Sequence, residues 1–148
     1  MAHVNRHIAA PPDRIFEILA DGWTYAAWVV GTAHIRAVDA HWPAPGSRIH
    51  HAVGPWPLVI RDTTTVSEST PGQRLLLRVR MWPIGEGDVE FVVEPSPGGI
   101  GSAVRMTETV VSGPWGLLGP VTDSLLHARN VATLDRLAAL AEHRTAAD

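Results

Sequence analysis

Between residues 34 and 112 the chain consists of short segments in which apolar and polar side chains alternate, each closed by Pro, Gly or Ser. Alternation with a period of two indicates β-strands, and short turns rich in Pro and Gly join consecutive strands. The segments cover residues 34–40, 48–54, 58–68, 74–82, 88–94 and 102–112. Six strands in series predict a meandering antiparallel sheet.

Helices and one more strand flank this series. Residues 3–9 predict the additional strand, and the Pro-Pro-Asp sequence at 11–13 predicts the start of a helix over residues 14–20. Residues 22–30 predict a second short helix. Residues 120–142, rich in Leu, Ala and Arg, predict a single helix of about six turns.

The composition limits the chemistry available to the chain. It has no Cys, and all 12 of its cationic residues are Arg, so thiolate zinc sites, cysteine nucleophiles and lysine Schiff bases are excluded. The net charge of −3 comes without a basic stripe, which argues against a nucleic-acid partner. The eight His show no metal-ligand spacing, so we expect neither a metal site nor a cofactor.

The organisation of the chain is simple. We see no internal repeat and no linker, and expect a single domain over residues 1–148 with an ordered core at about 3–143. No run approaches the roughly 18 apolar residues of a membrane helix, and no signal peptide is visible. We therefore expect a cytoplasmic protein without a membrane span.

One face of the predicted sheet is apolar. In strands 74–82 and 88–94 this face alternates with a face of Arg, Asp and Glu, where we expect cross-strand ion pairs. The inward side chains of these two strands are Leu75, Leu77, Val79, Met81, Val89, Phe91 and Val93. In strand 102–112 the same face holds Val104, Met106 and Val110 together with Glu108, a carboxylate alone among apolar neighbours.

The long helix carries an apolar stripe, which at about 100° per residue runs through Leu126, Val131, Leu134, Leu137, Ala138 and Ala141. Asp123, His127 and Asn130 fall on this stripe in the first half of the helix. A helix that only sealed a core would have no need of three polar groups there. A helix that borders a cavity tolerates them, because water or a ligand satisfies their hydrogen bonds.

The chain resembles the polyketide cyclase/dehydrase-like branch of the START/Bet v1 (SRPBCC) superfamily over nearly its whole length. The resemblance is carried by residues 9–16, 23–28, 45–48 and 71–75 and by the Arg129-Asn130 pair in the last helix. It implies an α+β helix-grip fold, in which a curved seven-stranded antiparallel sheet wraps around a long C-terminal helix, with two short helices after the first strand. It also implies a deep cavity for an apolar or aromatic small molecule.

Glu108 and His127 are the candidate catalytic residues. Burial among apolar groups disfavours an ionised carboxylate, so Glu108 could act as a general acid or base; alternatively, it is bonded to Arg or Trp at the rim of the sheet. Asp123 and His127 are spaced i, i+4, which allows a carboxylate to orient an imidazole. Alternatively, Asp123 stabilises the helix dipole and His127 lies near a wet opening.

Other side chains are expected to contact a ligand. His51 shares a strand face with Ile49, and Asp62 shares one with Ile60, whereas Asn130 either reaches a ligand carbonyl or bonds to a strand backbone. The six Trp gather at turns and element ends, where they either cap the core or stack on a planar ligand. The full set of expected ligand contacts is Trp28, His51, Trp56, Asp62, Met81, Phe91, Met106, Trp115, Asp123 and Asn130.

Three functions remain open at this point. The first is binding of an apolar or aromatic molecule in the cavity, with chemistry similar to that of a polyketide cyclase or dehydratase; an enzyme of this kind would be a cofactor-independent aromatase/cyclase or dehydratase. The second is a non-catalytic carrier or sensor for a lipid or aromatic metabolite. The third is a protein-interaction module with an incidental cavity. The oligomeric state, monomer or homodimer, is also open.

Overall fold

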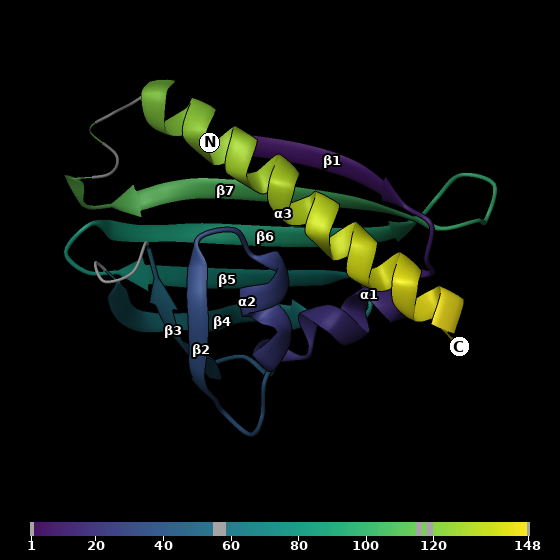
Figure 1. The fold of residues 1–148 in the computed structure, drawn as a ribbon, viewed down its shortest axis with the longest axis horizontal. Helices are drawn as coiled ribbons and strands as arrows, with labels where there is room; N and C mark the ends of the chain where they lie inside the picture. The colour runs from purple at the N-terminus through teal and green to yellow at the C-terminus, as the bar shows by residue number, and fades with distance from the viewer. Residues whose placement is uncertain (1, 55–58, 115–116, 118–119, 148) are drawn as a thin grey trace.

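The computed structural model describes residues 2–54, 59–114, 117 and 120–147 (Figure 1). A strand, β1 (Ala2–Ile8), leads into three short helices, α1 (Pro12–Leu19), η1 (Gly22–Thr24) and α2 (Tyr25–Trp28). The six strands that follow are β2 (Thr32–Val38), β3 (Arg48–Val53), β4 (Ile60–Thr70), β5 (Arg74–Met81), β6 (Gly85–Pro95) and β7 (Ser102–Ser112). The last element is the long helix α3 (Pro120–Ala147), which extends past the predicted end at 142.

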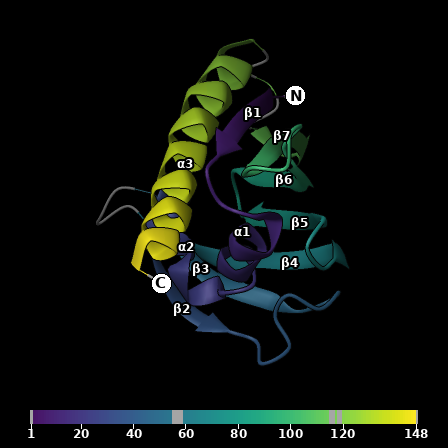
Figure 2. The same cartoon turned by 90° about the vertical axis from the view of Figure 1, so that its right-hand side faces the viewer.

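The strands form one seven-stranded sheet in the order β1-β7-β6-β5-β4-β3-β2, and every neighbouring pair is antiparallel. All strands but β1 follow chain order, whereas β1 joins the edge next to β7. Figure 2 shows α3 standing along one side of the curved sheet, with α1 and α2 on that same side. The predicted helix-grip α+β fold is therefore confirmed.

The two faces of the sheet differ as the alternation predicts. Leu75, Leu77 and Phe91 are buried on the inner face. On the outer face Arg74 pairs with Glu90 at 2.7 Å and Arg78 with Asp88 at 2.6 Å, each across the β5–β6 ladder. These half-exposed pairs contribute little to stability, and they leave the apolar inner face as the surface that the helices must cover.

An aromatic cluster joins the short helices to the sheet. The ring of Tyr25 lies 4.6 Å from that of Trp28 and 5.7 Å from that of Trp42, and Trp28 meets the edge of Phe91 on β6 at 5.7 Å between ring centroids. Helix α1 ends at Leu19, whose carbonyl accepts hydrogen bonds from the Tyr25 hydroxyl (2.7 Å) and the Trp42 indole N–H (3.1 Å). The cluster thus satisfies a helix end while it fills the core.

Two glycines allow a close approach where β7 ends beside the β5–β6 turn. Gly113 has a φ of 95°, and a Cβ placed on it would lie 2.5 Å from the carbonyl oxygen of Ile84 and would also overlap Gly85. Only glycine combines this backbone conformation with this separation. The contact holds the end of β7 against the start of β6.

We expect Gly113→Ala to lower the free energy of unfolding by about 1–3 kcal/mol more than Gly98→Ala, because only the former adds overpacking to backbone strain. Gly98 is the matched control, since it has a φ of 96° but no described heavy atom within 4 Å of the place that an alanine methyl would occupy. Urea unfolding of both variants measures the difference. Equal losses would contradict the close approach at Gly113.

Candidate functional site

A cavity of about 370 Å³ lies between the inner face of the sheet, α3 and the segment that joins α2 to β2. Its volume is at the small end of the range of ligand pockets, about 300–1,000 Å³. Most of its walls are aliphatic or aromatic. They include Val29, Ile35, Ile49, Ile60, Leu77, Val79, Met81, Val89, Phe91 and Met106.

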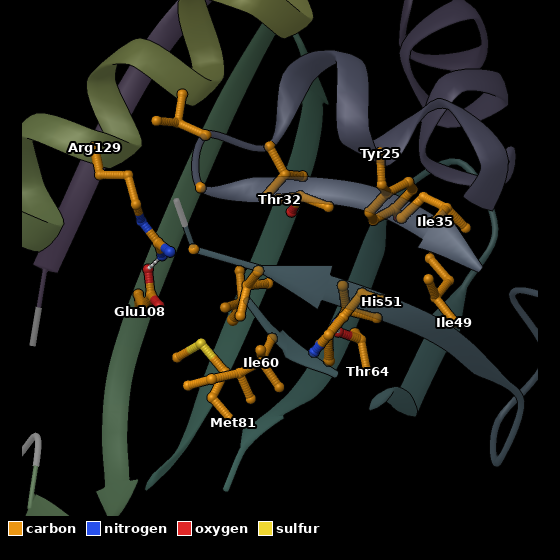
Figure 3. Close-up of a pocket in the computed structure, with 18 of the residues that line it drawn as sticks. Tyr25, Thr32, Ile35, Ile49, His51, Ile60, Thr64, Met81, Glu108 and Arg129 are labelled. Atoms are coloured by element: carbon orange, nitrogen blue, oxygen red, sulfur yellow. Dashed lines mark hydrogen bonds and ion pairs between the residues drawn. The ribbon is translucent and has the colours of Figure 1, made fainter. Parts of the chain in front are cut away.

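One ion pair lies in the wall of this cavity. Glu108, on β7, is 2% exposed, and its Oε1 accepts a hydrogen bond from Nη2 of Arg129 on α3. Figure 3 shows the guanidinium of Arg129 reaching from the helix to the carboxylate on the strand. A charge buried in apolar surroundings is tolerated when it is paired, so the pair explains how Glu108 is accommodated on the inner face.

Two donors beside this pair are left without an acceptor in the described part of the chain. Nη2 of Arg129 also lies 3.4 Å from Oδ1 of Asn130. Among the described residues, however, Nε of Arg129 and Nδ2 of Asn130 are buried donors without a hydrogen-bond partner. Unsatisfied buried donors are costly, and a water molecule bound beside them would relieve that cost.

His51, on β3, has both ring nitrogens engaged. Nε2–H donates to the carbonyl of Arg80 (3.1 Å), and Nδ1 accepts from the hydroxyl of Thr64 (3.0 Å). Because a carbonyl can only accept, these contacts fix the Nε2–H tautomer of a neutral ring. Burial lowers the pKa of His51, in agreement with a neutral side chain. Figure 3 shows His51 and Thr64 together, away from the Glu108–Arg129 pair.

Tyr25 and Thr32 are further polar side chains of the cavity wall. The Tyr25 hydroxyl donates to the carbonyl of Leu19. Burial, with a smaller contribution from Asp21, raises the pKa of Tyr25 well above its usual value, so the phenol stays protonated. The hydroxyl is therefore committed to holding the helix end.

Five of the sequence-predicted site residues line the cavity. Four of them, His51, Met81, Phe91 and Met106, come from four different strands of the sheet. The fifth is Glu108, and its partner is an Arg, as one of the two alternatives for this residue proposed. The period-two alternation placed all five correctly on the inner face.

Three other predicted ligand contacts lie beside the cavity without lining it. Trp28 is fully buried in the aromatic cluster, and its indole N–H donates to the Thr24 hydroxyl at 3.1 Å. Asp62 accepts from the backbone N–H of Trp82 at 2.9 Å, at the start of the β5–β6 turn. Asn130 is fully buried beside Arg129. Trp56 and Trp115 lie outside the described residues.

The expectation that Asp123 and His127 face the cavity is wrong. Both side chains are exposed, as is Val131 at 38%, and none of the three lines the cavity. Helix α3 instead turns the opposite edge of its stripe inwards, with Leu126, Asn130 and Thr133 buried. Residues spaced by four on one edge of a broad stripe share one environment, so Asp123, His127 and Val131 all face the solvent together.

Arg129 and the segment from Val29 to Thr32 also line the cavity, although the sequence pattern did not point to them. Arg129 precedes Asn130 and lies on the edge of the helix that holds Leu126 and Thr133. The polar Asn130 and Thr133 in line with Leu126 could have indicated that edge. The backbone N–H of Val30 donates to the Thr133 hydroxyl at 3.1 Å, which holds the unpredicted segment against the helix.

Two other kinds of feature are absent from the described residues. No group of three or more His, Asp or Glu side chains there is arranged to hold a metal ion. None of the helices in the described ranges is long and apolar enough to cross a membrane.

We expect the stability of the protein to fall more steeply between pH 7 and pH 5 than that of His51→Gln. The unfolded chain takes up a proton at His51 near its ordinary pKa, whereas the folded protein, with its lowered pKa, does so only at lower pH. The contribution of His51 to the free energy of unfolding is therefore complete above the pKa of the unfolded chain. Below that pKa it declines, at most by about 1.4 kcal/mol per pH unit.

Urea unfolding at several pH values measures this difference. His34→Gln, an exposed histidine on β2, is the control for removing a histidine. Parallel pH profiles for the wild type and His51→Gln would show that His51 is not held neutral.

The fold is shared with solved structures of low sequence identity. The Zhui aromatase/cyclase from Streptomyces sp. R1128 is 20% identical, with a TM-score of 0.65 over 97% of this chain and 94% of that one. The di-domain aromatase/cyclase StfQ of the steffimycin biosynthetic pathway is 16% identical, with a TM-score of 0.70 over 97% of this chain and 51% of that one. A Staphylococcus aureus protein of unknown function, SA2116, reaches a TM-score of 0.76 at 9% identity, over 97% and 94% of the two chains.

The sequence itself gives the family. No curated protein matches it. A family model described as polyketide cyclase/dehydrase and lipid transport matches residues 1–142. Since this match extends over nearly all 148 residues, the resemblance carried by the turn and strand-junction motifs is confirmed, and the chain belongs to the polyketide cyclase/dehydrase and lipid transport family.

Proposed function

We propose that this protein binds a small, largely apolar molecule with a planar ring inside the cavity, with one oxygen of the ligand at the Glu108–Arg129 end. The observation that carries the proposal is the distribution of polarity in the wall. Aliphatic and aromatic side chains form most of it, and its charged pair lies at one end.

The apolar walls supply the affinity in this proposal. Removing a ring from water into a cavity lined by Val79, Met81, Phe91 and Met106 is favoured by about 25 cal/mol for each Å² of apolar surface buried. The cavity is small, which favours a ligand of one or two rings over a long lipid chain. The guanidinium of Arg129, which lines the cavity, orients the ligand, because an acceptor oxygen gains a charge-assisted hydrogen bond at that end.

The similar proteins support a ligand of this kind. Two of the structures that share the fold are described as aromatase/cyclases, and the family description joins cyclisation and dehydration with lipid transport. A cavity that holds an apolar molecule serves both purposes. The fold alone does not select between a carrier and an enzyme.

A second candidate function is cofactor-independent cyclisation or dehydration of a ketone substrate, and the Glu108–Arg129 pair favours it. A carboxylate beside the carbon next to a carbonyl accepts a proton from that carbon, while a guanidinium N–H stabilises the resulting enolate oxygen. The enolate carbon then attacks a second carbonyl of the same chain, and loss of water completes an aldol condensation. His51 takes no part, since both of its ring nitrogens are occupied.

We expect Val79→Phe to weaken the binding of a planar aromatic ligand at least about tenfold, because the added ring fills the cavity. The matched control is Val92→Phe, which adds the same ring on β6 at a position paired with Arg74, on the outer face of the sheet. Titration calorimetry with a neutral naphthalene derivative measures both. Equal affinity in the two variants would place binding outside the cavity.

For the catalytic candidate, we expect Glu108→Gln to change the product profile of a poly-β-ketone cyclisation assay, because the amide cannot accept the proton. His127→Ala is the control, since this exposed histidine lies outside the cavity wall. An unchanged profile with Glu108→Gln, together with retained ligand binding, would favour the carrier over the enzyme.

A further inference from the structure

We propose that Glu108 makes the cavity selective for neutral ligands that carry a carbonyl or another uncharged acceptor, and excludes carboxylates because it already balances the charge of the Arg129 guanidinium. This inference rests on the proposed binding function and adds the chemical class of the ligand. It concerns the role of a buried anion in selectivity and does not require that the protein catalyses a reaction.

The charge balance of the cavity favours neutral ligands. Among the described residues of the wall, the charged side chains are Glu108 and Arg129, and they compensate each other. His51 adds no charge at neutral pH, because burial lowers its pKa and its two ring nitrogens bond to neutral groups. A neutral ligand keeps this balance, whereas a carboxylate adds a second negative charge next to Glu108 in a largely apolar space, where like charges repel strongly.

The burial of Glu108 prevents its side chain from moving aside for a ligand carboxylate. Its side chain is only 3% exposed, so it cannot turn into water to make room for a competing anion. The outer-face acids differ in this respect. Glu90, which pairs with Arg74, has a side chain that is 27% exposed. A ligand carboxylate would therefore have to displace a buried anion that has no alternative partner of comparable charge in the described part of the wall.

Arg129 retains hydrogen-bonding capacity for an uncharged ligand. Its side chain lines the cavity and keeps 28% of its surface accessible, although Nη2 is occupied by Glu108. A guanidinium carries five N–H donors. Glu108 and Oδ1 of Asn130 occupy Nη2, and Nε is buried, which leaves the two donors of Nη1. The remaining donors can serve an uncharged oxygen, which requires a hydrogen bond and no counter-charge.

The experiment compares two probes of the same ring and similar size, naphthyl methyl ketone and naphthoate, by titration calorimetry at neutral pH. For the wild type we expect the ketone to bind at least about tenfold more tightly than naphthoate. For Glu108→Gln we expect the affinity for naphthoate to rise about tenfold or more, since Arg129 becomes free to pair with it. The affinity for the ketone should change by less than about threefold.

Two further variants keep the test decisive. Glu90→Gln removes the same charge from the outer face and should leave both affinities as in the wild type, which controls for the net charge of the protein. The double variant Glu108→Gln/Arg129→Gln removes both charges and should bind the ketone without gaining affinity for naphthoate. It remains informative if a lone Arg129 destabilises the single variant.

The outcomes separate the two proposals. Two outcomes would overturn the selectivity role of Glu108 and leave the binding function in place. One is equal affinity of the wild type for ketone and naphthoate, and the other is a folded Glu108→Gln variant whose affinity for naphthoate does not rise. If neither probe binds the wild type or Val79→Phe, the proposed binding function fails, and the selectivity proposal fails with it.

Discussion

The apolar inner face of the sheet is wider than one helix can cover. Seven strands spaced by about 4.8 Å span roughly 30 Å, whereas a helix with its side chains is about 10–12 Å across. Helix α3 lies along one part of this face, and α1 and α2 cover another (Figures 1 and 2). The uncovered part between them becomes a partly open cavity, whose walls are the same strand faces that elsewhere form the core.

The polar groups of the cavity divide into two kinds. His51, Thr64 and Tyr25 satisfy one another or the backbone, so they maintain the shape of the wall. Glu108 and Arg129 satisfy each other across the space between the sheet and α3, and unsatisfied donors remain beside them. Polar residues of the first kind are structural, and those of the second kind are the ones to which we assign a ligand in the proposed function. Composition does not distinguish the two, because the distinction depends on hydrogen-bond partners.

The strand pattern was predictable because alternation and turn residues are local properties. The apolar faces of β5 and β6, the outer Arg–acid pairs and the inward Glu108 all follow from a period of two. The orientation of α3 was not predictable to the same degree. Its stripe is broad enough that either edge could face the sheet, and the choice depends on packing with distant strands. The tryptophans illustrate the same limit, because Trp28 is buried in the aromatic cluster whereas Trp82 is 70% exposed, although both lie at the ends of elements.

The hydrogen bond between Val30 and Thr133 links two parts of the cavity that are far apart in the sequence. Thr133 lies one helical turn after Arg129, so the helix that carries the charged end also holds the segment from Val29 to Thr32. A rigid displacement of α3 by a bound molecule would therefore move both regions at once. A single turn of helix thus connects the guanidinium at one end of the cavity with the backbone that forms another part of its wall.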